Sequence, residues 1–366
     1  MLICFGKGWQ KKLGLSGIYT KKGTKSFFIK ILAFPGEETS CGYMEKRVQY
    51  VKVWRKSRKM KQKKILFIVN PRSGKGQIKY QLLDIADVFI KGGLDVSLYI
   101  TQEPQDAIRV VRERAQEFDL IACSGGDGTL DEVVTGMMDC TEKRPIGYIP
   151  AGSTNDFANS LQLPKHMKEA AQCIVEDIAY PCDVGSFNGD YFVYIAAFGI
   201  FTDVSYLTNQ EMKNILGHLA YLLEGAKRIF NIKSYHVELE INDEHIEDDY
   251  IFGMITNSES VGGFRSITGR DIQLDDGLLE VTLIRMPRNP IELQDIISSL
   301  LRREMDSKYI STFKTGRIVL RSQTEIPWTL DGEFGGDHKE VEILCHQKAV
   351  PILVNNLPEL EEGPSE

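Results

Sequence analysis

The chain has 366 residues, of which 42% are hydrophobic and 26% are charged, a composition typical of a soluble globular protein of about two domains. Its formal net charge of −7 combines a basic start with an acidic body: residues 1–60 hold 14 basic and 3 acidic residues, which leaves 30 basic and 48 acidic residues for 61–366. An acidic body argues against a general nucleic-acid binder, because phosphate neutralisation needs clustered Lys and Arg.

No apolar run approaches the roughly 18 uncharged residues of a membrane span. The best N-terminal candidate, 27–34, is short, is interrupted by Lys30 and has no cleavage site after it, so we expect no signal peptide. The seven cysteines show no CxxC spacing and the six histidines no HxxxH or HxH grouping. We therefore expect neither a disulfide framework nor a zinc site, and a cytoplasmic location.

Residues 1–60 show no sustained strand or helix pattern and end in a basic run at 52–59. Three interpretations of this basic N-terminal extension stay open. It is an arm attracted to anionic lipid, where each exposed Lys or Arg adds about 1 kcal/mol, or it is a nucleic-acid arm. Alternatively, translation starts at Met44 or Met60, and the extension is a disordered or mis-assigned start.

From Lys64 onward, strands and helices alternate. Residues 65–69 form a continuous apolar run, as expected of a strand buried on both faces of a parallel sheet. Further strands are predicted at 96–100, 119–123 and 146–149, and helices at 77–91, 105–116 and 130–138. The alternation predicts that 61–183 is an α/β domain with a parallel sheet and helices on both faces.

After about Pro181, short strand candidates dominate. They are predicted at 191–197, 234–241, 250–256, 278–284, 317–321 and 341–344, with helices at 211–230 and 290–303. Closely spaced strands predict a mainly antiparallel β-sandwich as the second domain, 184–355, whose C-terminal part has room to pack back on the first. Residues 356–366 are predicted to be an acidic, frayed tail.

Three loops rich in small residues follow predicted strands, so all would lie at the carboxyl edge of the sheet, where open α/β sheets bind ligands. They are 70–76 (Asn-Pro-Arg-Ser-Gly-Lys-Gly), 124–130 (Ser-Gly-Gly-Asp-Gly-Thr-Leu) and 150–157 (Pro-Ala-Gly-Ser-Thr-Asn-Asp-Phe). Bare glycine N–H groups let phosphate oxygens approach closely. A tight turn explains the first loop equally well, and helix capping explains Asp127 or Asp156 singly. Neither explains three such loops converging on one edge.

These loops resemble the motifs of the diacylglycerol kinase catalytic-domain family, and more closely those of its soluble bacterial lipid kinases. The Gly-Gly-Asp-Gly-Thr element is shared with NAD kinases, whereas the order Asn-Asp-Phe in the third loop favours the lipid kinases. The similarity runs from about Lys64 to Leu353 and leaves residues 1–60 outside.

The resemblance implies that the glycine loops bind ATP. The positions that match the family's nucleotide contacts are Asn70, Pro71, Arg72, Ser73, Gly74, Thr101, Gly126, Asp127, Gly128, Thr129, Leu130, Asp131, Glu132 and Ser153. A strand-end turn is the alternative role for Thr101.

In the second domain, the motif Leu-Asp-Gly-Glu at 330–333 matches the family's catalytic motif. Phosphoryl transfer to an alcohol needs a group that accepts the hydroxyl proton. In the family this Asp is the proposed general base, so the resemblance assigns that role to Asp331. A hairpin turn is the alternative, since Asp-Gly is a common turn pair.

The resemblance also implies Mg²⁺, whose charge offsets that of the transferring phosphoryl group. The acidic positions that the family places around the catalytic metal match Asp127, Asp156 and Asp183. A separate structural Mg²⁺ site is implied at 273–278, with a carboxylate and two backbone carbonyls as ligands from Asp276, Gln273 and Leu278. A plain acidic turn is the alternative.

The sequence thus predicts a cytoplasmic, ATP- and Mg²⁺-dependent kinase of a membrane-resident lipid hydroxyl, with diacylglycerol as the expected acceptor. The lipid requires peripheral contact with the inner face of the membrane, and no nucleic-acid partner is expected. Monomer and homodimer stay open. Two alternatives remain: an NAD kinase-like phosphotransferase, against which the Asn-Asp-Phe loop argues, and a non-catalytic nucleotide- or lipid-binding protein, against which Asp127 and Asp331 argue.

Overall fold

The computed structural model describes residues 27–30, 50–53, 62–200, 233–241, 244–258, 260–261, 264–265, 272–302, 304 and 307–356. The chain forms two compact units, Met1–Lys61 and Gln62–Glu366. In the first unit, β1 (Phe27–Lys30) and β2 (Tyr50–Val53) form an antiparallel pair. The sequence pattern predicts no sustained strand there, because each strand is only four residues long. The helix predicted at 211–230 and most of the 356–366 tail lie outside the described residues.

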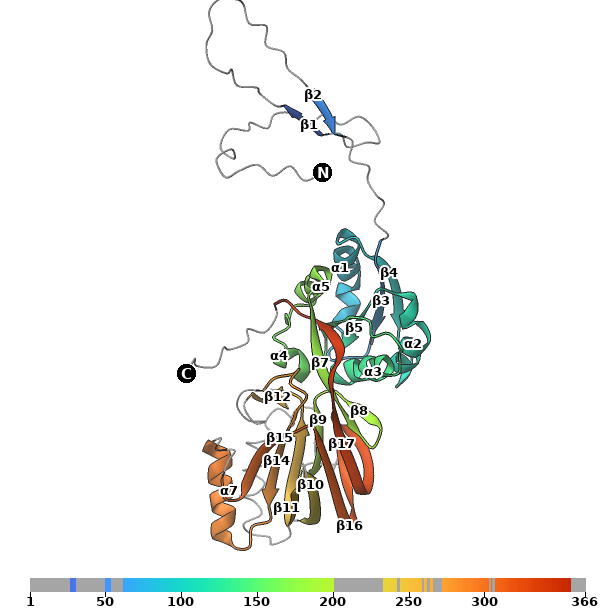
Figure 1. The fold of residues 1–366 in the computed structure, drawn as a ribbon. Helices are drawn as coiled ribbons and strands as arrows, with labels where there is room; N and C mark the ends of the chain where they lie inside the picture. Colours follow the sequence, from blue (N-terminus) through green and yellow to red (C-terminus); the bar gives the residue numbers. More distant parts are fainter. Residues whose placement is uncertain are drawn as a thin grey trace, which may run out of the picture. The chain divides into compact units, whose positions relative to one another are not determined.

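The second unit begins with alternating strands and helices (Figure 1). In chain order they are β3 (Lys64–Val69), α1 (Ile78–Lys91), β4 (Asp95–Ile100), α2 (Asp106–Arg114), η1 (Ala115–Glu117), β5 (Leu120–Gly125), α3 (Asp127–Met138), β6 (Ile146–Pro150), α4 (Asp156–Ser160) and α5 (Met167–Glu176). The four strands pair in parallel in the order β6-β5-β3-β4. The short helix α4 and the helix α5 have no counterpart in the sequence prediction.

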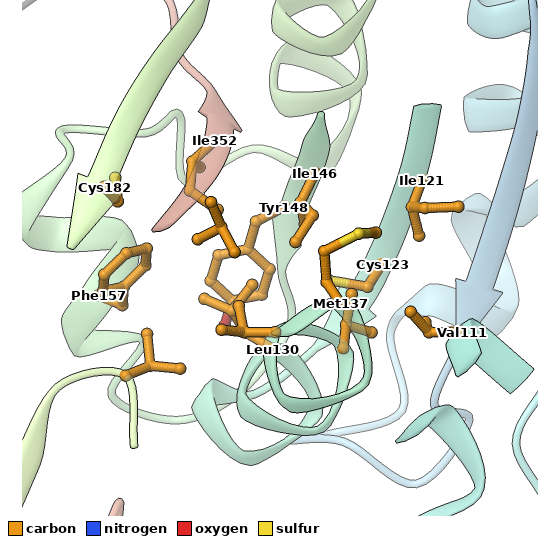
Figure 2. Packing of buried hydrophobic residues seen from close by; sticks show 14 of the residues in the cluster. Val111, Ile121, Cys123, Leu130, Met137, Ile146, Tyr148, Phe157, Cys182 and Ile352 are labelled. Carbon is orange, nitrogen blue, oxygen red and sulfur yellow. The ribbon is translucent and has the colours of Figure 1, made fainter. Parts of the chain in front are cut away.

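Side chains of β3 alternate between two hydrophobic cores. Leu66 and Ile68 pack with residues of α2 and α3, whereas Ile65 and Phe67 pack with residues of α1 and α5. Figure 2 shows part of the first core, with Leu130 of α3 among its members. Because both faces of β3 are covered by helices, its sequence is apolar without interruption.

The remaining strands pair mostly antiparallel. They are β7 (Ala179–Phe187), β8 (Asp190–Phe192), β9 (Ile195–Gly199), β10 (Tyr235–Ile241), β11 (Glu244–Thr256), β12 (Ser260–Val261), β13 (Phe264–Arg265), β14 (Leu279–Arg285), β15 (Ile310–Thr315), β16 (Arg317–Leu330) and β17 (Glu333–Leu353), with one helix, α7 (Pro290–Arg302). Trp328 is fully buried in their core, 4.9 Å from Phe187 and 4.8 Å from Phe198 between ring centroids. No helix in the described part of the chain is long and apolar enough to cross a bilayer.

The hairpin β16–β17 is longer than the sequence predicts. Its outer part carries cross-strand ion pairs, in which Arg317 lies 2.8 Å from Glu342 and Arg321 lies 3.0 Å from Glu340. Three of these four residues lie within the strands predicted at 317–321 and 341–344. Beyond Arg321, the exposed polar residues 323–325 and a register shift between Arg321 and Ile326 interrupt the alternating pattern, so the sequence does not predict this part of β16.

Two strands join the parallel and antiparallel regions into one sheet. β17 pairs antiparallel with β7, and its end pairs in parallel with β6 through Ile352 and Ile146. Val350 and Ile352 belong to the same core as the helices α2 and α3. The boundary expected between 183 and 184 therefore falls inside β7, a strand of the shared sheet.

The three small-residue loops meet at the carboxyl edge of the parallel strands. The Asn70 N–H donates to the Ser124 carbonyl over 2.9 Å, and the Ala151 N–H donates to the Gly125 carbonyl over 2.7 Å. The Ser73 hydroxyl accepts a hydrogen bond from the Gly126 N–H at 3.2 Å. Each loop is thereby fixed to its neighbour by backbone contacts.

Two glycines are required because the loops approach so closely. A Cβ atom on Gly74 would lie 2.2 Å from the Ala151 carbonyl oxygen, and the φ angle of Gly74 is +54°. A Cβ atom on Gly152 would lie 2.6 Å from the Gly126 Cα. No side chain fits at either position without moving the loops apart.

The close contact between the second and third loops can be tested with Gly152→Ala. We expect the added methyl group to reduce the free energy of unfolding by about 1–3 kcal/mol, since overpacking forces the backbone to shift. Urea denaturation measures this change. Gly128→Ala is the matched control, because its Cβ would meet nothing nearer than the Glu333 Oε1 at 3.9 Å. Equal stability of the two variants would contradict the contact.

Candidate active site

The first two loops present hydrogen-bond donors beside the start of α3. The Asn70 side chain donates to the Thr129 hydroxyl over 3.0 Å and accepts the Arg72 N–H over 3.0 Å. α3 begins after Gly126, which supplies no side-chain cap. Arg72 and Lys75 are exposed on the first loop. A helix N-terminus beside basic side chains is suited to binding phosphate groups.

Asp127 connects the second loop to the third. Its carboxylate accepts the Asp156 N–H at 3.1 Å, the Phe157 N–H at 3.4 Å and the Thr154 hydroxyl at 3.2 Å. Asp127 is therefore the first residue of α3, and its side chain also caps the N-terminus of α4, which lies later in the chain. Burial raises the pKa of Asp127 to about 6, and the negative charge of Asp156 contributes to the rise.

Asp331 occupies the turn between β16 and β17 with a φ angle of +47°. Its buried carboxylate accepts three consecutive backbone N–H groups, from Val193 at 2.6 Å, Tyr194 at 3.0 Å and Ile195 at 2.9 Å. Burial raises the pKa of Asp331 to about 6, and these hydrogen bonds limit the rise. The Glu333 carboxylate of the same turn approaches Gly128, so the turn lies beside the second glycine loop, and the charge of Asp331 contributes to the raised pKa of Asp127.

Two acidic residues of α3 contact neighbouring elements: Asp131 lies at this turn, and Glu132 lies at the start of α2. Asp131 is hydrogen-bonded to Asp331, and burial and the charge of Asp331 raise its pKa well above the usual range. Glu132 accepts the N–H groups of Gln105 at 2.9 Å and Ala107 at 3.1 Å, so its side chain caps the N-terminus of α2. Asp131 and Glu132, which the resemblance matches to nucleotide contacts, thus each have a hydrogen-bond partner within the protein.

The remaining predicted contacts lie around the same edge. Thr101 follows β4, and its N–H donates to the Val69 carbonyl over 3.0 Å, so it is a strand-end residue beside the first loop. Ser153 lies in the third loop, where it lines a cavity of about 430 Å³. The other lining residues are Pro150, Thr154, Asn155, Ala158, Asn159, Leu163 and Lys165.

The contacts of the Asp183 carboxylate place this residue in a second group of acidic side chains. That carboxylate accepts the Gly277 N–H at 2.6 Å and the Lys348 N–H at 2.6 Å. Burial raises its pKa, and the charges of Asp276 and Asp275 raise it further. The structure therefore places Asp183 at the 273–278 turn, whereas the resemblance places it with Asp127 and Asp156.

At the 273–278 turn, one Asp276 oxygen accepts the Leu278 N–H at 2.9 Å and the other lies 3.1 Å from the Lys314 ammonium. Lys314 also lies 3.2 Å from Glu280, whose pKa burial raises to about 7. Gln273 is exposed. Lys314 thus places a positive charge beside Asp276, and the metal site implied at 273–278 stays a prediction.

The carboxylates at the glycine loops fit a hard cation better. Asp127 and Asp156 are both buried, and the charge of Asp156 raises the pKa of Asp127. A bound Mg²⁺ would offset this repulsion, and carboxylate oxygens are its preferred protein ligands. Within the described residues, however, no group of three or more His, Cys, Asp or Glu side chains is arranged to hold a metal ion.

The sequence did not reveal the donors that hold Asp331. Val193, Tyr194 and Ile195 act through backbone N–H groups, which carry no residue signature. Glu333 was part of the matched motif, and its carboxylate approaches Gly128 of the second loop. Only the pairing of β9 with β16 could have located the three donors.

Two family models match the chain. Residues 64–187 match the diacylglycerol kinase catalytic domain, and residues 195–354 match the YegS C-terminal NAD kinase beta sandwich-like domain. The first match contains the three glycine loops, and the second contains Asp331. Together they cover the parallel region and the β-sandwich-like region described above.

Curated relatives and solved structures agree with these matches. A diacylglycerol kinase of Bacillus subtilis is 33% identical over 277 residues, which cover 75% of this chain and 91% of the relative. A diacylglycerol kinase of Staphylococcus saprophyticus is 32% identical over 276 residues, 75% of this chain and 90% of the relative. A crystal structure of a diacylglycerol kinase from Bacillus anthracis matches with a TM-score of 0.65 and 25% identity, over 81% of this chain and 98% of that one. The chain therefore belongs to the diacylglycerol kinase family and is a kinase.

Proposed function

We propose that this kinase transfers the γ-phosphoryl group of ATP to a lipid hydroxyl, with diacylglycerol as acceptor and phosphatidic acid as product. The observation that carries the proposal is the buried carboxylate of Asp331, which lies close to the second glycine loop and the start of α3. The relatives named diacylglycerol kinase support the choice of acceptor.

The loops supply what a triphosphate needs. The N-terminus of α3 carries a partial positive charge, and Arg72 and Lys75 extend from the first loop. No side chain fits at Gly74 or Gly152, so the backbone of the loops is not covered by a side chain at these two positions. Phosphate oxygens would therefore meet N–H groups and two basic side chains.

Asp331 is suited to accept the proton of the acceptor hydroxyl. When the acceptor oxygen forms its bond to the γ-phosphorus, its O–H bond breaks and the proton moves to the Asp331 carboxylate, while ADP leaves with the electrons of the broken P–O bond. Three N–H donors hold the carboxylate in place for this step. A pKa of about 6 keeps Asp331 ionised at neutral pH yet makes it more basic than an exposed Asp.

Asp127 and Asp156 would hold Mg²⁺, which offsets the charge of the transferring phosphoryl group when it is bound. Their burial and mutual repulsion are the structural support for this assignment. Asp127 also fixes the third loop through its hydrogen bonds to the N–H groups of 156 and 157.

The acceptor can be identified by offering the purified protein labelled Mg-ATP with diacylglycerol in mixed micelles, with NAD, or with no acceptor. We expect label in phosphatidic acid only. Other lipid alcohols, with prenyl or sphingoid chains, form a second panel. Label in NAD and none in any lipid would replace the proposal with an NAD kinase activity.

The role of Asp331 can be tested with Asp331→Asn. We expect the transfer rate to fall about 10²–10⁴-fold, the usual contribution of a general base, while ATP binding measured by calorimetry persists. Asp337→Asn, an exposed residue of β17, is the control. In the unaltered protein the transfer rate should decline as the pH falls through about 6, because protonated Asp331 accepts no proton. Undiminished turnover in Asp331→Asn would reject the assignment.

We further propose that the enzyme binds the membrane surface peripherally, on the cytoplasmic side, through the start of α1. Tyr80 and Leu83 are 88% and 84% exposed there, one and two turns after the first loop. Lys75 and Lys79 are exposed beside them. Apolar side chains next to lysines match the acyl and anionic headgroup regions of a bilayer. Residues 1–60 add eleven net positive charges to the same protein.

Sedimentation with anionic and with neutral phospholipid vesicles tests this surface. We expect the double variant Tyr80→Ser and Leu83→Ser to lose vesicle binding, whereas Ile291→Ser, which removes a side chain of α7 that is 74% exposed, should not. A chain that starts at Met60 measures the contribution of the basic extension. Unchanged binding of the double variant in that shortened chain would contradict docking through α1.

A further inference from the structure

A second carboxyl group lies against the proposed base. Asp131 of α3 and Asp331 are in hydrogen-bond contact. The Oδ1 oxygen of Asp131 is buried and accepts no hydrogen bond from the described residues. The residue as a whole is half-buried, but as a carboxylate it would keep one charged oxygen that neither solvent nor a described donor reaches, which is costly. The transfer step described above gives Asp131 no role.

The surroundings of the pair are acidic. Glu132 and Glu333 act on Asp131 from α3 and β17, Asp127 acts on Asp331 from the start of α3, and the Tyr194 phenol adjoins the same charges. Two carboxyl groups in contact cannot both be ionised at ordinary pH unless a cation separates them. One of the two therefore carries a proton.

The hydrogen bonds decide which group carries it. Asp331 accepts three backbone N–H groups, and such donors stabilise the carboxylate form. Asp131, with its unbonded oxygen, gains nothing comparable from ionisation. A protonated Asp131 instead provides an O–H donor to Asp331, which completes the shell of donors around that carboxylate.

We propose that Asp131 holds a proton that it donates in a hydrogen bond to Asp331, so that the two form a singly protonated pair in which Asp131 positions the base. This inference rests on the proposed role of Asp331 in phosphoryl transfer. Before transfer the pair holds one proton and one negative charge. When the acceptor O–H bond breaks, its proton binds Asp331, so the pair is neutral with two protons, and one proton returns to water after product release.

The proton on Asp131 also reduces the negative charge that the triphosphate meets. Asp127, Asp156 and Asp331 already lie at the loops, and a further ionised carboxyl group would weaken the binding of an anionic substrate. Burial and the charge of Asp331 raise the pKa of Asp131 well above the usual range, which agrees with this geometry.

The pH dependence of stability tests the pair without any enzyme assay. Folded Asp131 keeps its proton at pH values where the unfolded chain has lost it, so the stability of the unaltered protein falls as the pH rises above about 3.9, the pKa of an exposed Asp. Asp131→Asn has the same shape and no proton to lose. Its Tm should therefore exceed that of the unaltered protein by an amount that grows between about pH 5 and pH 9.

Asp84→Asn is the matched control, because Asp84 is exposed on α1, and its Tm difference should show no such trend. A pH-independent Tm difference for Asp131→Asn would overturn the proposal. If that variant does not fold, Asp331→Asn replaces it: without the neighbouring charge, Asp131 ionises more readily, so the decline of Tm with pH should shrink. An unchanged decline would also overturn the proposal.

Activity provides a separate readout. The pH profile of kcat/KM for the unaltered protein should fall on the alkaline side, where Asp131 loses its proton, and Asp131→Asn should lack this fall. The same alkaline fall in both proteins would overturn the proposal. If no acceptor is phosphorylated by either, the proposed function fails, while the Tm measurements still decide whether Asp131 carries the proton.

Discussion

The burial of a negative charge at Asp331 is the constraint on which the rest of the site depends. A carboxylate is stable inside a protein only if donors replace the water that it has lost. The three N–H groups of 193–195 do so, and they point at the β16–β17 turn because β9 pairs with both β11 and β16. The strand order of the sandwich-like region therefore supplies the donors that stabilise the Asp331 carboxylate in its charged form.

The same constraint extends through the neighbouring carboxyl groups. Each acidic side chain at the loops has a different means of compensation: Asp127 accepts N–H groups of α4, Glu132 caps α2, and Asp131 contacts Asp331. Positive charge at the loops comes from the helix terminus of α3, from the exposed Arg72 and Lys75 of the first loop, and from Lys165 beside the third. An anionic substrate that binds together with a cation, such as the magnesium-bound triphosphate proposed above, would balance these charges.

Part of the fold and part of the candidate site could be predicted from the sequence. The strands β3, β5 and β6 are buried almost throughout, so their apolar runs were evident, and the glycines of the loops are required by backbone contacts as close as that of Gly74. The length of β16 beyond Arg321 was hidden by exposed polar residues at 323–325 and by a register shift between Arg321 and Ile326. The assignments of Asp183 and Glu132 rely on resemblance and stay predictions; the sequence did not reveal that both carboxylates accept backbone N–H groups from distant segments. Pairing between distant segments leaves no local pattern in a sequence.

The end of β17 has a consequence for how the protein is made. Ile352 pairs with Ile146, about 200 residues earlier, and Val350 and Ile352 fill the core beneath α2 and α3. A ribosome-bound chain that has already produced all three glycine loops still lacks this strand, so one edge of the nucleotide-binding sheet stays unpaired until β17 is synthesised. Unpaired strand edges are the usual sites of misassembly. The nascent protein therefore depends on a late, long-range step before its earliest motifs acquire their final geometry.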